Sequence, residues 1–298
     1  MLAGKAYQIK DIITGRYYYP RDPDGMGEIS ESSRPLQDGE FAEWILLDGT
    51  PATCANIGLH NLYKDEIDLL LSGPNLGRNT SSAFALSSGT IGAALSSSLS
   101  QIRSIALSYG TVIHPTPDSF FHPAHDLSLR IIQHLYDNWG TDPEGLRSGE
   151  IDLYNVNIPM VEGLLGEDDL PIYWTRIWRN TYGRLFEAYM QGNAAVLTSA
   201  GSAAGPDALS STFIPVASPA STDVEPKALG SLVFKFAPDM TNLINPAEHM
   251  LPEGSDGWAM MKGWVSVTPM RASFAEPVSA HGVHVDGTIQ DRVWKMKL

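Results

Sequence analysis

The sequence predicts an α/β fold whose central sheet is mainly parallel. Between residues 43 and 158, short apolar segments of strand length alternate with longer segments of helical character, which is typical of parallel strands joined by crossover helices. After Pro171 the pattern changes to short β-rich segments. Hydrophobic residues make up 43% and charged residues 18% of the 298 positions, so the chain is globular and long enough for a sizeable core.

The predicted strands are short apolar runs, most of them bounded by turn residues. They cover residues 9–13, 15–19, 43–47, 67–71, 105–108 and 153–158. Residues 67–71 predict a fully buried strand, followed by a loop rich in Gly, Asn and Ser that extends to Gly89. Residues 20–39, rich in Asp, Gly, Ser and Pro, predict another loop.

Three segments predict helices, over residues 52–62, 90–102 and 126–139. The first follows Thr50 and Pro51, because Thr caps helices well and Pro fits the first helical position. The second consists mostly of small residues, and the third is amphipathic. Later β segments are predicted over residues 172–178, 232–236 and 264–268.

The chain is expected to form one domain over residues 1–279, followed by a tail over 280–298. Within that domain, residues 194–226 are Ala, Ser, Gly, Pro or Thr at 23 of 33 positions. Such a composition buries too little apolar surface to order itself, so this segment predicts a mobile insertion.

The acidic balance excludes several classes of partner. The chain has 20 Lys plus Arg against 34 Asp plus Glu, a formal net charge of -14, which argues against binding nucleic acid. It also has no apolar run long enough to span a membrane. Its one cysteine, Cys54, excludes an intramolecular disulfide and fits a reducing compartment, so we expect a cytoplasmic protein.

The best candidate site in the sequence is the segment 72–90, which follows a predicted strand. In open α/β sheets, ligands bind beyond the carboxyl ends of the strands, and the N-terminus of a helix suits a phosphate. An ordinary N-cap before the helix and a turn at Asn75 explain the same pattern. The residues with candidate roles are Gly73, Asn75, Gly77, Asn79, Ser87, Ser88, Gly89 and Thr90.

Three neighbouring histidines are a second candidate site. His114, His122 and His125 lie close together, and the last two are three residues apart, a spacing that a metal site can use. Because prolines intervene, we expect a loop there, and solvated loop histidines are the simpler interpretation.

Several segments carry a resemblance to a known family. Residues 72–79 read Ser-Gly-Pro-Asn-Leu-Gly-Arg-Asn, and residues 88–94 read Ser-Gly-Thr-Ile-Gly-Ala-Ala. They resemble the signature of the SurE survival-protein family of metal-dependent phosphatases and nucleotidases. Further collinear matches lie at residues 49–54, 156–159, 175–176, 254–256 and 264–269.

The resemblance is strongest to the fungal branch of that family, which includes acid phosphatases and SurE domains joined to a tubulin-tyrosine-ligase-like domain. It implies a Rossmann-like, doubly wound, mainly parallel sheet in a three-layer α/β/α arrangement, with C-terminal β-hairpin extensions. It also implies assembly into a homo-oligomer.

The function that this resemblance implies is hydrolysis of phosphomonoesters with a divalent metal, Mg²⁺ or Mn²⁺. The substrates are those of an acid phosphatase or of a nucleoside 5′- or 3′-monophosphate phosphatase. The roles carried over are catalysis for Ser88 and Asn79, phosphate binding for Gly73, Gly89 and Thr90, and metal binding for Asn75.

One departure from the family pattern affects the metal. The family's N-D-D-G aspartates and a following serine have no counterpart in the sequence, because residues 4–6 match positions directly after that serine. We therefore expect an incomplete ligand set, impaired activity and low stability. Two explanations are a truncated or mis-started reading of the gene for an active enzyme and a remnant that binds phosphate or a nucleotide without catalysis. A pure interaction module is a third interpretation.

Overall fold

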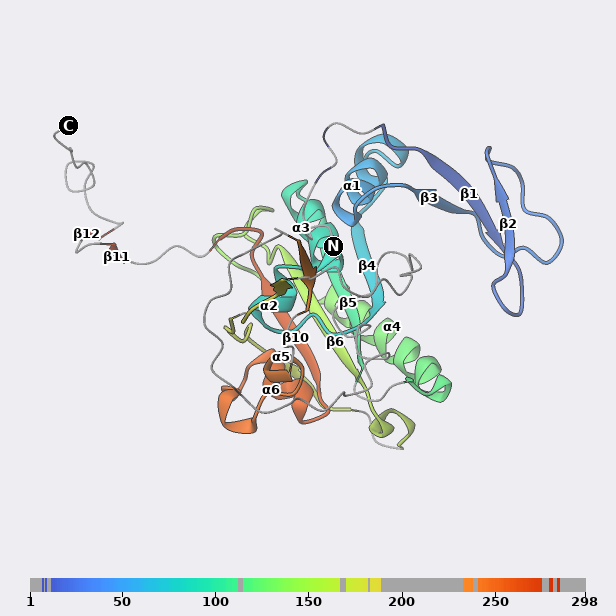
Figure 1. The fold of residues 1–298 in the computed structure, drawn as a ribbon. Coiled ribbons are helices and arrows are strands. Elements are labelled where there is room, and N and C mark those ends of the chain that lie inside the picture. Colours follow the sequence, from blue (N-terminus) through green and yellow to red (C-terminus); the bar gives the residue numbers. More distant parts are fainter. Residues whose placement is uncertain are drawn as a thin grey trace.

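The protein is built around a five-stranded sheet with the strand order β4-β5-β6-β10-β7 (Figure 1). The computed structural model describes residues 7, 9, 12–111, 115–166, 170–181, 183–188, 233–237, 241–274, 279–280 and 283–284. Strands β4 (Leu69–Leu76), β5 (Arg103–Thr111) and β6 (Leu153–Met160) are parallel. Strand β10 (Val265–Met270) is antiparallel to β6, and β7 (Ile172–Trp174) is parallel to β10. The predicted mainly parallel α/β fold is confirmed.

The two faces of this sheet differ in chemistry. Because side chains alternate along a strand, each strand contributes to both faces. One face packs apolar residues such as Ile105 and Val156 against helix α4 (Phe121–Asp137). The other face packs Ala106 and Leu153 against helix α3 (Gly89–Leu99) and also carries a row of buried polar residues. These are Ser108, Asn155, Asn157, Ser266 and Thr268.

The three predicted helices are present. Helix α1 (Pro51–Ile57) continues as a turn of π-helix over Gly58–Leu62. Thr50 caps it as predicted, since its Oγ1 accepts a hydrogen bond from the N–H of Thr53 at 3.2 Å. Helix α1 packs on α3. None of the helices among the described residues combines the length and the apolar character that crossing a membrane requires.

Helix α4 begins five residues earlier than predicted, so the expected loop at His122 and His125 is wrong. Pro123, which has no backbone N–H, is tolerated there because the first helical turn needs no N–H donor at that position. His122 pairs with Asp126, and His125 Nδ1 lies 2.8 Å from the Tyr109 hydroxyl. His114 lies outside the described residues.

Strand β4 differs most from its prediction. It was expected over residues 67–71 as a fully buried strand, but it is the edge strand of the sheet over the described residues, and Leu71 is 48% exposed. It also continues through Gly73 and Asn75, which were predicted to lie in a loop. The register shifts between Ser72 and Asn75, so a bulge at this point turns the chain.

Two predicted loops contain regular structure. Residues 20–39 include strand β2 (Gly27–Ser30), and the loop before Gly89 includes helix α2 (Ser81–Ala85). The strand predicted over residues 9–13 is absent at the described positions 9, 12 and 13. The proposed insertion 194–226 lies outside the described residues.

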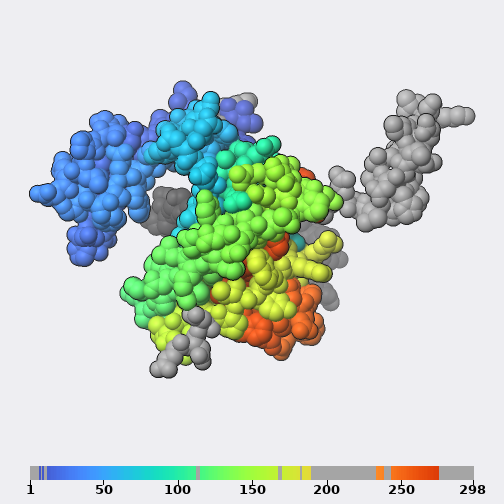
Figure 2. All heavy atoms as spheres, turned by 180° about the vertical axis from the view of Figure 1, so that it is seen from behind, coloured from blue at the N-terminus to red at the C-terminus, as the bar shows by residue number. Residues whose placement is uncertain are grey.

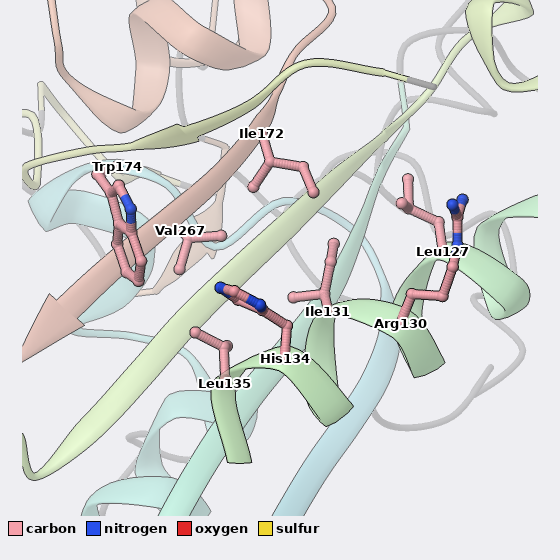
Figure 3. A pocket seen from close by; sticks show the side chains of 8 residues that line it. All are labelled: Leu127, Arg130, Ile131, His134, Leu135, Ile172, Trp174 and Val267. Carbon is pink, nitrogen blue, oxygen red and sulfur yellow. The ribbon is translucent and has the colours of Figure 1, made fainter. Parts of the chain in front are cut away.

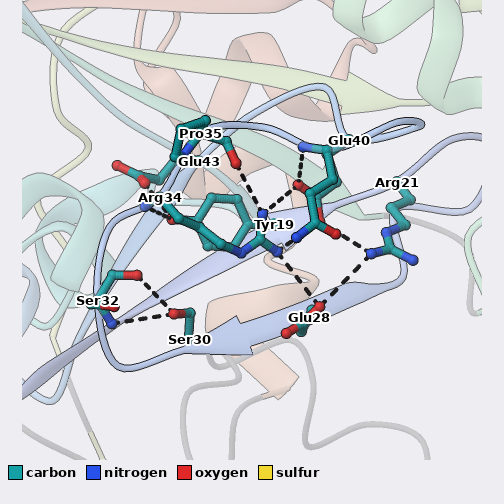
Figure 4. Close-up of polar contacts among 10 residues, drawn as sticks. Tyr19, Arg21, Glu28, Ser30, Ser32, Arg34, Pro35, Glu40 and Glu43 are labelled. Atoms are coloured by element: carbon teal, nitrogen blue, oxygen red, sulfur yellow. Dashed lines mark hydrogen bonds and ion pairs between the residues drawn. The ribbon is translucent and has the colours of Figure 1, made fainter.

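Residues 15–47 form a separate antiparallel sheet, here called the arm, in the order β2-β1-β3. Strands β1 (Gly15–Pro20) and β3 (Trp44–Leu47) confirm two predictions. The arm stands out from the body beside α1 in both views (Figures 1 and 2). Glu40 holds it together by accepting hydrogen bonds from Arg34 at 2.8 and 2.9 Å and from Arg21 at 3.2 Å (Figure 4).

The remaining elements are short. Each predicted late β segment contains a strand, and β8 (Phe186–Ala188) pairs with β9 (Phe234–Phe236) in a separate two-stranded antiparallel sheet. The others are the 3₁₀ turns Asp118–Phe120, Glu162–Leu165 and Glu248–Met250, helices α5 (Thr241–Ile244) and α6 (Asp256–Met261), and strands β11 (Ser279–Ala280) and β12 (Val283–His284).

Candidate functional site

A polar cluster at the end of β4 is centred on the side chain of Asn75. Its Oδ1 accepts three hydrogen bonds, from Asn79 Nδ2 at 2.9 Å, Thr90 Oγ1 at 2.9 Å and Ser108 Oγ at 2.8 Å. Its Nδ2 donates to the carbonyl of Gly77 at 3.0 Å. One amide thus joins β4, the turn after it, the start of α3 and the middle of β5.

Asn79 is fixed through both its side chain and its backbone. Its Nδ2 donates to Ser108 Oγ at 2.8 Å as well as to Asn75. Its backbone N–H donates to Asn157 Oδ1 at 2.7 Å, and its carbonyl accepts from Asn155 Nδ2 at 2.9 Å. The motif over residues 72–79 predicted Asn75 and Asn79, and the family match over 156–159 contained Asn157 without a role, but neither indicated Ser108 or Asn155. Two asparagines two residues apart in a buried strand were the available signal for Asn155 and Asn157.

Helix α3 starts beside this cluster. Ser88 is its N-cap, because Ser88 Oγ accepts a hydrogen bond from the N–H of Ile91 at 3.1 Å. The first-turn N–H groups of Gly89 and Thr90 have no partner within the helix. Since Thr90 Oγ1 reaches Asn75, the positive end of the helix dipole lies at the cluster, where it favours an anion.

Two glycines of the predicted site are also required by packing. Gly73 has φ +112, and a Cβ there would lie 2.2 Å from the carbonyl oxygen of Leu107 on β5. A Cβ on Gly89 would lie 2.8 Å from Cγ of Pro51 at the start of α1. The first contact brings β4 close to β5, and the second brings the start of α3 close to the start of α1. They explain both glycines without any ligand.

The one strongly shifted carboxyl pKa near the cluster, among the described residues, belongs to Asp256 at the start of α6. Asp256 Oδ2 accepts a hydrogen bond at 2.7 Å from the N–H of Ser81, two residues after Asn79. Burial raises the pKa of Asp256 to about 6, against the lowering effect of the backbone N–H groups that donate to it. Sequence reasoning placed Asp256 in a family motif but assigned it no contact.

The described residues do not fit a complete metal site. A hard divalent cation is held by several oxygen ligands, usually including carboxylates. Asn75 Oδ1, the predicted ligand, already accepts three hydrogen bonds. Over the described part of the chain, no group of three or more His, Cys, Asp or Glu side chains comes together.

A cavity of about 330 Å³ lies elsewhere, between α4 and the edge strand β7 (Figure 3). Val267 in its wall belongs to the apolar face of the sheet, whereas Asn155 and Asn157 lie on the opposite face. The sheet therefore separates the cavity from the Asn75 cluster. Its lining residues are Leu127, Arg130, Ile131, His134, Leu135, Ile172, Trp174 and Val267.

The sequence that forms this cluster matches a known protein family. The family model described as "Survival protein SurE" matches residues 4–184, more than half of the 298 residues. The chain belongs to the SurE family.

Two relatives show how this SurE chain compares with named proteins. It is 46% identical over 147 residues to "Probable tubulin--tyrosine ligase PBY1" of Saccharomyces cerevisiae, a match that covers 48% of this chain and 18% of the yeast protein. It is 34% identical over 144 residues to "5'-nucleotidase SurE" of Ruegeria pomeroyi, covering 47% of this chain and 53% of the bacterial one. The chain thus spans about half the length of such bacterial relatives.

A solved structure supports the fold. The crystal structure of the SurE protein from Aquifex aeolicus superposes with a TM-score of 0.52 at 19% identity, covering 91% of this chain and 78% of that chain. With the sheet described above, it confirms the Rossmann-like α/β fold of SurE.

Four of the SurE motif segments converge in space on the Asn75 cluster. Residues 72–79 form its centre and 88–94 its helix. Residue Asn157, in the segment 156–159, holds the N–H of Asn79, and Asp256, in 254–256, holds that of Ser81. Segments that are far apart in the sequence thus meet around one turn of the backbone.

Proposed function

We propose that this SurE chain binds phosphomonoesters at the start of α3 and hydrolyses them, with nucleoside 5′- or 3′-monophosphates as the substrate class. The observation that carries the proposal is that Thr90 Oγ1, in the first turn of α3, donates to Asn75, so the helix begins at the Asn75 cluster. Bacterial relatives named 5′-nucleotidase support the substrate class.

The phosphoryl group would be held by donors of this chain. The N–H groups of Gly89 and Thr90 and the positive end of the α3 dipole stabilise charge on its oxygens. The hydroxyl of Ser88 still has its proton to donate, because its oxygen acts as acceptor in the cap. Both N–H bonds of the Asn79 side chain are used, so its role is to orient Asn75 rather than to touch the substrate.

The divalent metal that the family resemblance implies, Mg²⁺ or Mn²⁺, has Asn75 as its candidate ligand. Asn75 Oδ1 would have to exchange at least one of its three donors for the ion. Because the described residues offer no set of carboxylates, we expect weak metal binding and impaired turnover from this chain.

The test is release of inorganic phosphate from nucleoside monophosphates by the purified chain, with Mg²⁺ or Mn²⁺ and with EDTA. We expect slow release that depends on the metal. The variant Ser88→Ala removes the hydroxyl and the cap of α3 at once. The matched control, Ser87→Ala, removes the neighbouring hydroxyl, which donates to carbonyls of α2 and not to α3. No release from any common phosphomonoester, or equal activity of Ser88→Ala and native protein, would contradict hydrolysis at this site.

A second candidate function is phosphate or nucleotide binding without turnover. The full set of hydrogen bonds to Asn75 Oδ1 favours it, because these donors must be displaced before a metal can bind. Calorimetric titration with a nucleoside monophosphate, with and without EDTA, separates the two functions. Binding of the nucleoside monophosphate that is unchanged by EDTA, without release of inorganic phosphate, supports this second candidate.

A further inference from the structure

Asp256 carries a fully buried carboxylate that joins three parts of the chain. Its Oδ2 accepts the N–H of Ser81 at 2.7 Å. Its Oδ1 accepts the N–H of Trp178 at 2.9 Å and that of Gly257 at 2.7 Å. The residue is 0% exposed, so each of these bonds lies in a medium that strengthens it.

Together with two other residues of the C-terminal half, Asp256 caps helix α2. Thr80 stands at its N-cap position but makes no side-chain cap bond. The first-turn N–H groups of Ser81, Ser82 and Ala83 donate instead to Asp256, to the carbonyl of Trp178 at 2.8 Å and to Asn180 Oδ1 at 2.9 Å. The start of α2 therefore has its position set from outside the helix.

The backbone at this point needs such support. Ser81 has φ +71, in the left-handed region that residues with a Cβ occupy at a cost in free energy. Two residues earlier, Asn155 and Asn157 fix the peptide of Asn79. The turn from Asn79 to Ser81 is thus hydrogen-bonded at both ends. Asn155 and Asn157 bind its first residue, and Asp256 binds its last, the left-handed Ser81.

We propose that Asp256 is a positioning residue of the SurE site: its carboxylate keeps Ser81 left-handed and thereby keeps the Asn79 amide on Asn75. The inference rests on the proposed function only where it concerns the effect of Asp256 on phosphate binding. The effect of Asp256 on the turn from Asn79 to Ser81 is measured without any ligand.

The ionisation of Asp256 supports this role. The pKa is raised to about 6 by burial, and no charged side chain contributes to the shift. The charged residues of the segment packed against it, Arg176 and Arg179, have exposed side chains. As the pH falls through about 6, the carboxyl gains a proton and one oxygen becomes a donor, which opposes the backbone N–H groups around it.

The first test is amide hydrogen exchange of Ser81, followed by NMR, in Asp256→Asn and in a matched control. Ser255→Ala removes the neighbouring N-cap of α6, a bond of 3.2 Å to the N–H of Trp258, without touching Ser81. Exchange at Ser81 should rise about tenfold or more in Asp256→Asn, as loss of a charge-assisted hydrogen bond predicts, and much less in Ser255→Ala. Equal exchange in native protein and Asp256→Asn, or an equal rise in both variants, would overturn the proposal.

The second test is rescue. Glycine occupies φ +71 without a Cβ penalty, so Ser81→Gly should compensate in part for the lost carboxylate. We expect Asp256→Asn to weaken binding of inorganic phosphate about tenfold and the double variant to recover about threefold of that loss. A double variant no better than Asp256→Asn would contradict the positioning role.

Two outcomes separate this inference from the proposed function. If the native chain binds no phosphate and releases none, the function fails, while exchange at Ser81 still decides the role of Asp256. If Asp256→Asn does not fold, the native protein decides it: the amide proton shift of Ser81 should change when the Asp256 carboxyl gains its proton at falling pH, and no change at any pH at which the protein stays folded would refute the inference.

Discussion

Asn75 is the residue on which the site depends most. Three side chains from three elements direct their donors at one amide oxygen. A buried donor without an acceptor is costly, so removing this oxygen affects Asn79, Thr90 and Ser108 together.

We predict that Asn75→Ala lowers the free energy of unfolding by about 2 kcal/mol, because three donors lose their acceptor. Asn75→Asp keeps the acceptor oxygens and should lose about 1 kcal/mol or less, mainly the bond to Gly77. Urea denaturation of both variants measures the difference. Equal losses would show that the shared oxygen is not what stabilises the cluster.

Single residues of the site were predictable only where a motif or a local rule marked them. The motif indicated Asn75 and Asn79, and cap chemistry indicated Ser88. Asp256 contacts Ser81 across 175 positions and Asn157 contacts Asn79 across 78, and no local pattern specifies such pairs. The predicted roles of these residues in catalysis and binding stay predictions.

At the scale of elements, β4 shows why local patterns fail beside a site. At its bulge Gly73 has a positive φ, which an alternating strand pattern does not predict. The polar residues after Gly73 are typical of a loop, so the sequence predicts one there. Helix α2 has five residues and no cap of its own, so it forms through contacts that only the fold supplies. Helices α1 and α3 carry their own caps and were predicted well.

A matched pair of glycines tests the close approach of β4 to β5. Gly73 and Gly39 both have positive φ, +112 and +83, but a Cβ added at Gly73 would have neighbours within 4 Å and one added at Gly39 would have none. Gly39→Ala should cost about 1 kcal/mol from backbone strain. Gly73→Ala should cost about 2 kcal/mol more, because its Cβ meets a backbone oxygen that cannot move easily. Thermal unfolding compares them, and equal losses would refute the packing argument.

The arm offers a test by pH. Hydrogen bonds from Arg34, and further ones from the N–H of Gln37 and from Arg21, lower the pKa of Glu40 from 4.5 to about 2. A carboxyl whose pKa is lower in the folded state stabilises it above pH 4.5 and loses that effect as the pH falls towards 2.

Hydrogen exchange over residues 15–47, corrected for intrinsic rates, should therefore increase as the pH falls from about 4.5 towards about 2. Glu40→Gln should show the faster exchange already at about pH 7. Residues 105–108 of the central sheet serve as the internal reference. If native protein and Glu40→Gln responded alike to pH, Glu40 would not be the group that holds the arm.

At the scale of the whole molecule, the alternation of strands and helices and the order of the motifs were enough to predict a SurE fold. They did not predict that β10 runs antiparallel to β6, because the direction of a late strand depends on how the chain crosses the sheet. Nor did they predict that one face of the sheet is apolar while the other carries the polar row that supports the site. The domain boundaries and a homo-oligomer stay predictions.

The most direct test of the central claim is to map where a nucleoside monophosphate protects the native chain from hydrogen exchange. The account predicts protection at residues 75–79 and 88–91, where Asn75 meets the start of α3. Protection confined to the cavity between α4 and β7, at Leu127, Ile172 and Trp174, or no protection anywhere, would contradict it.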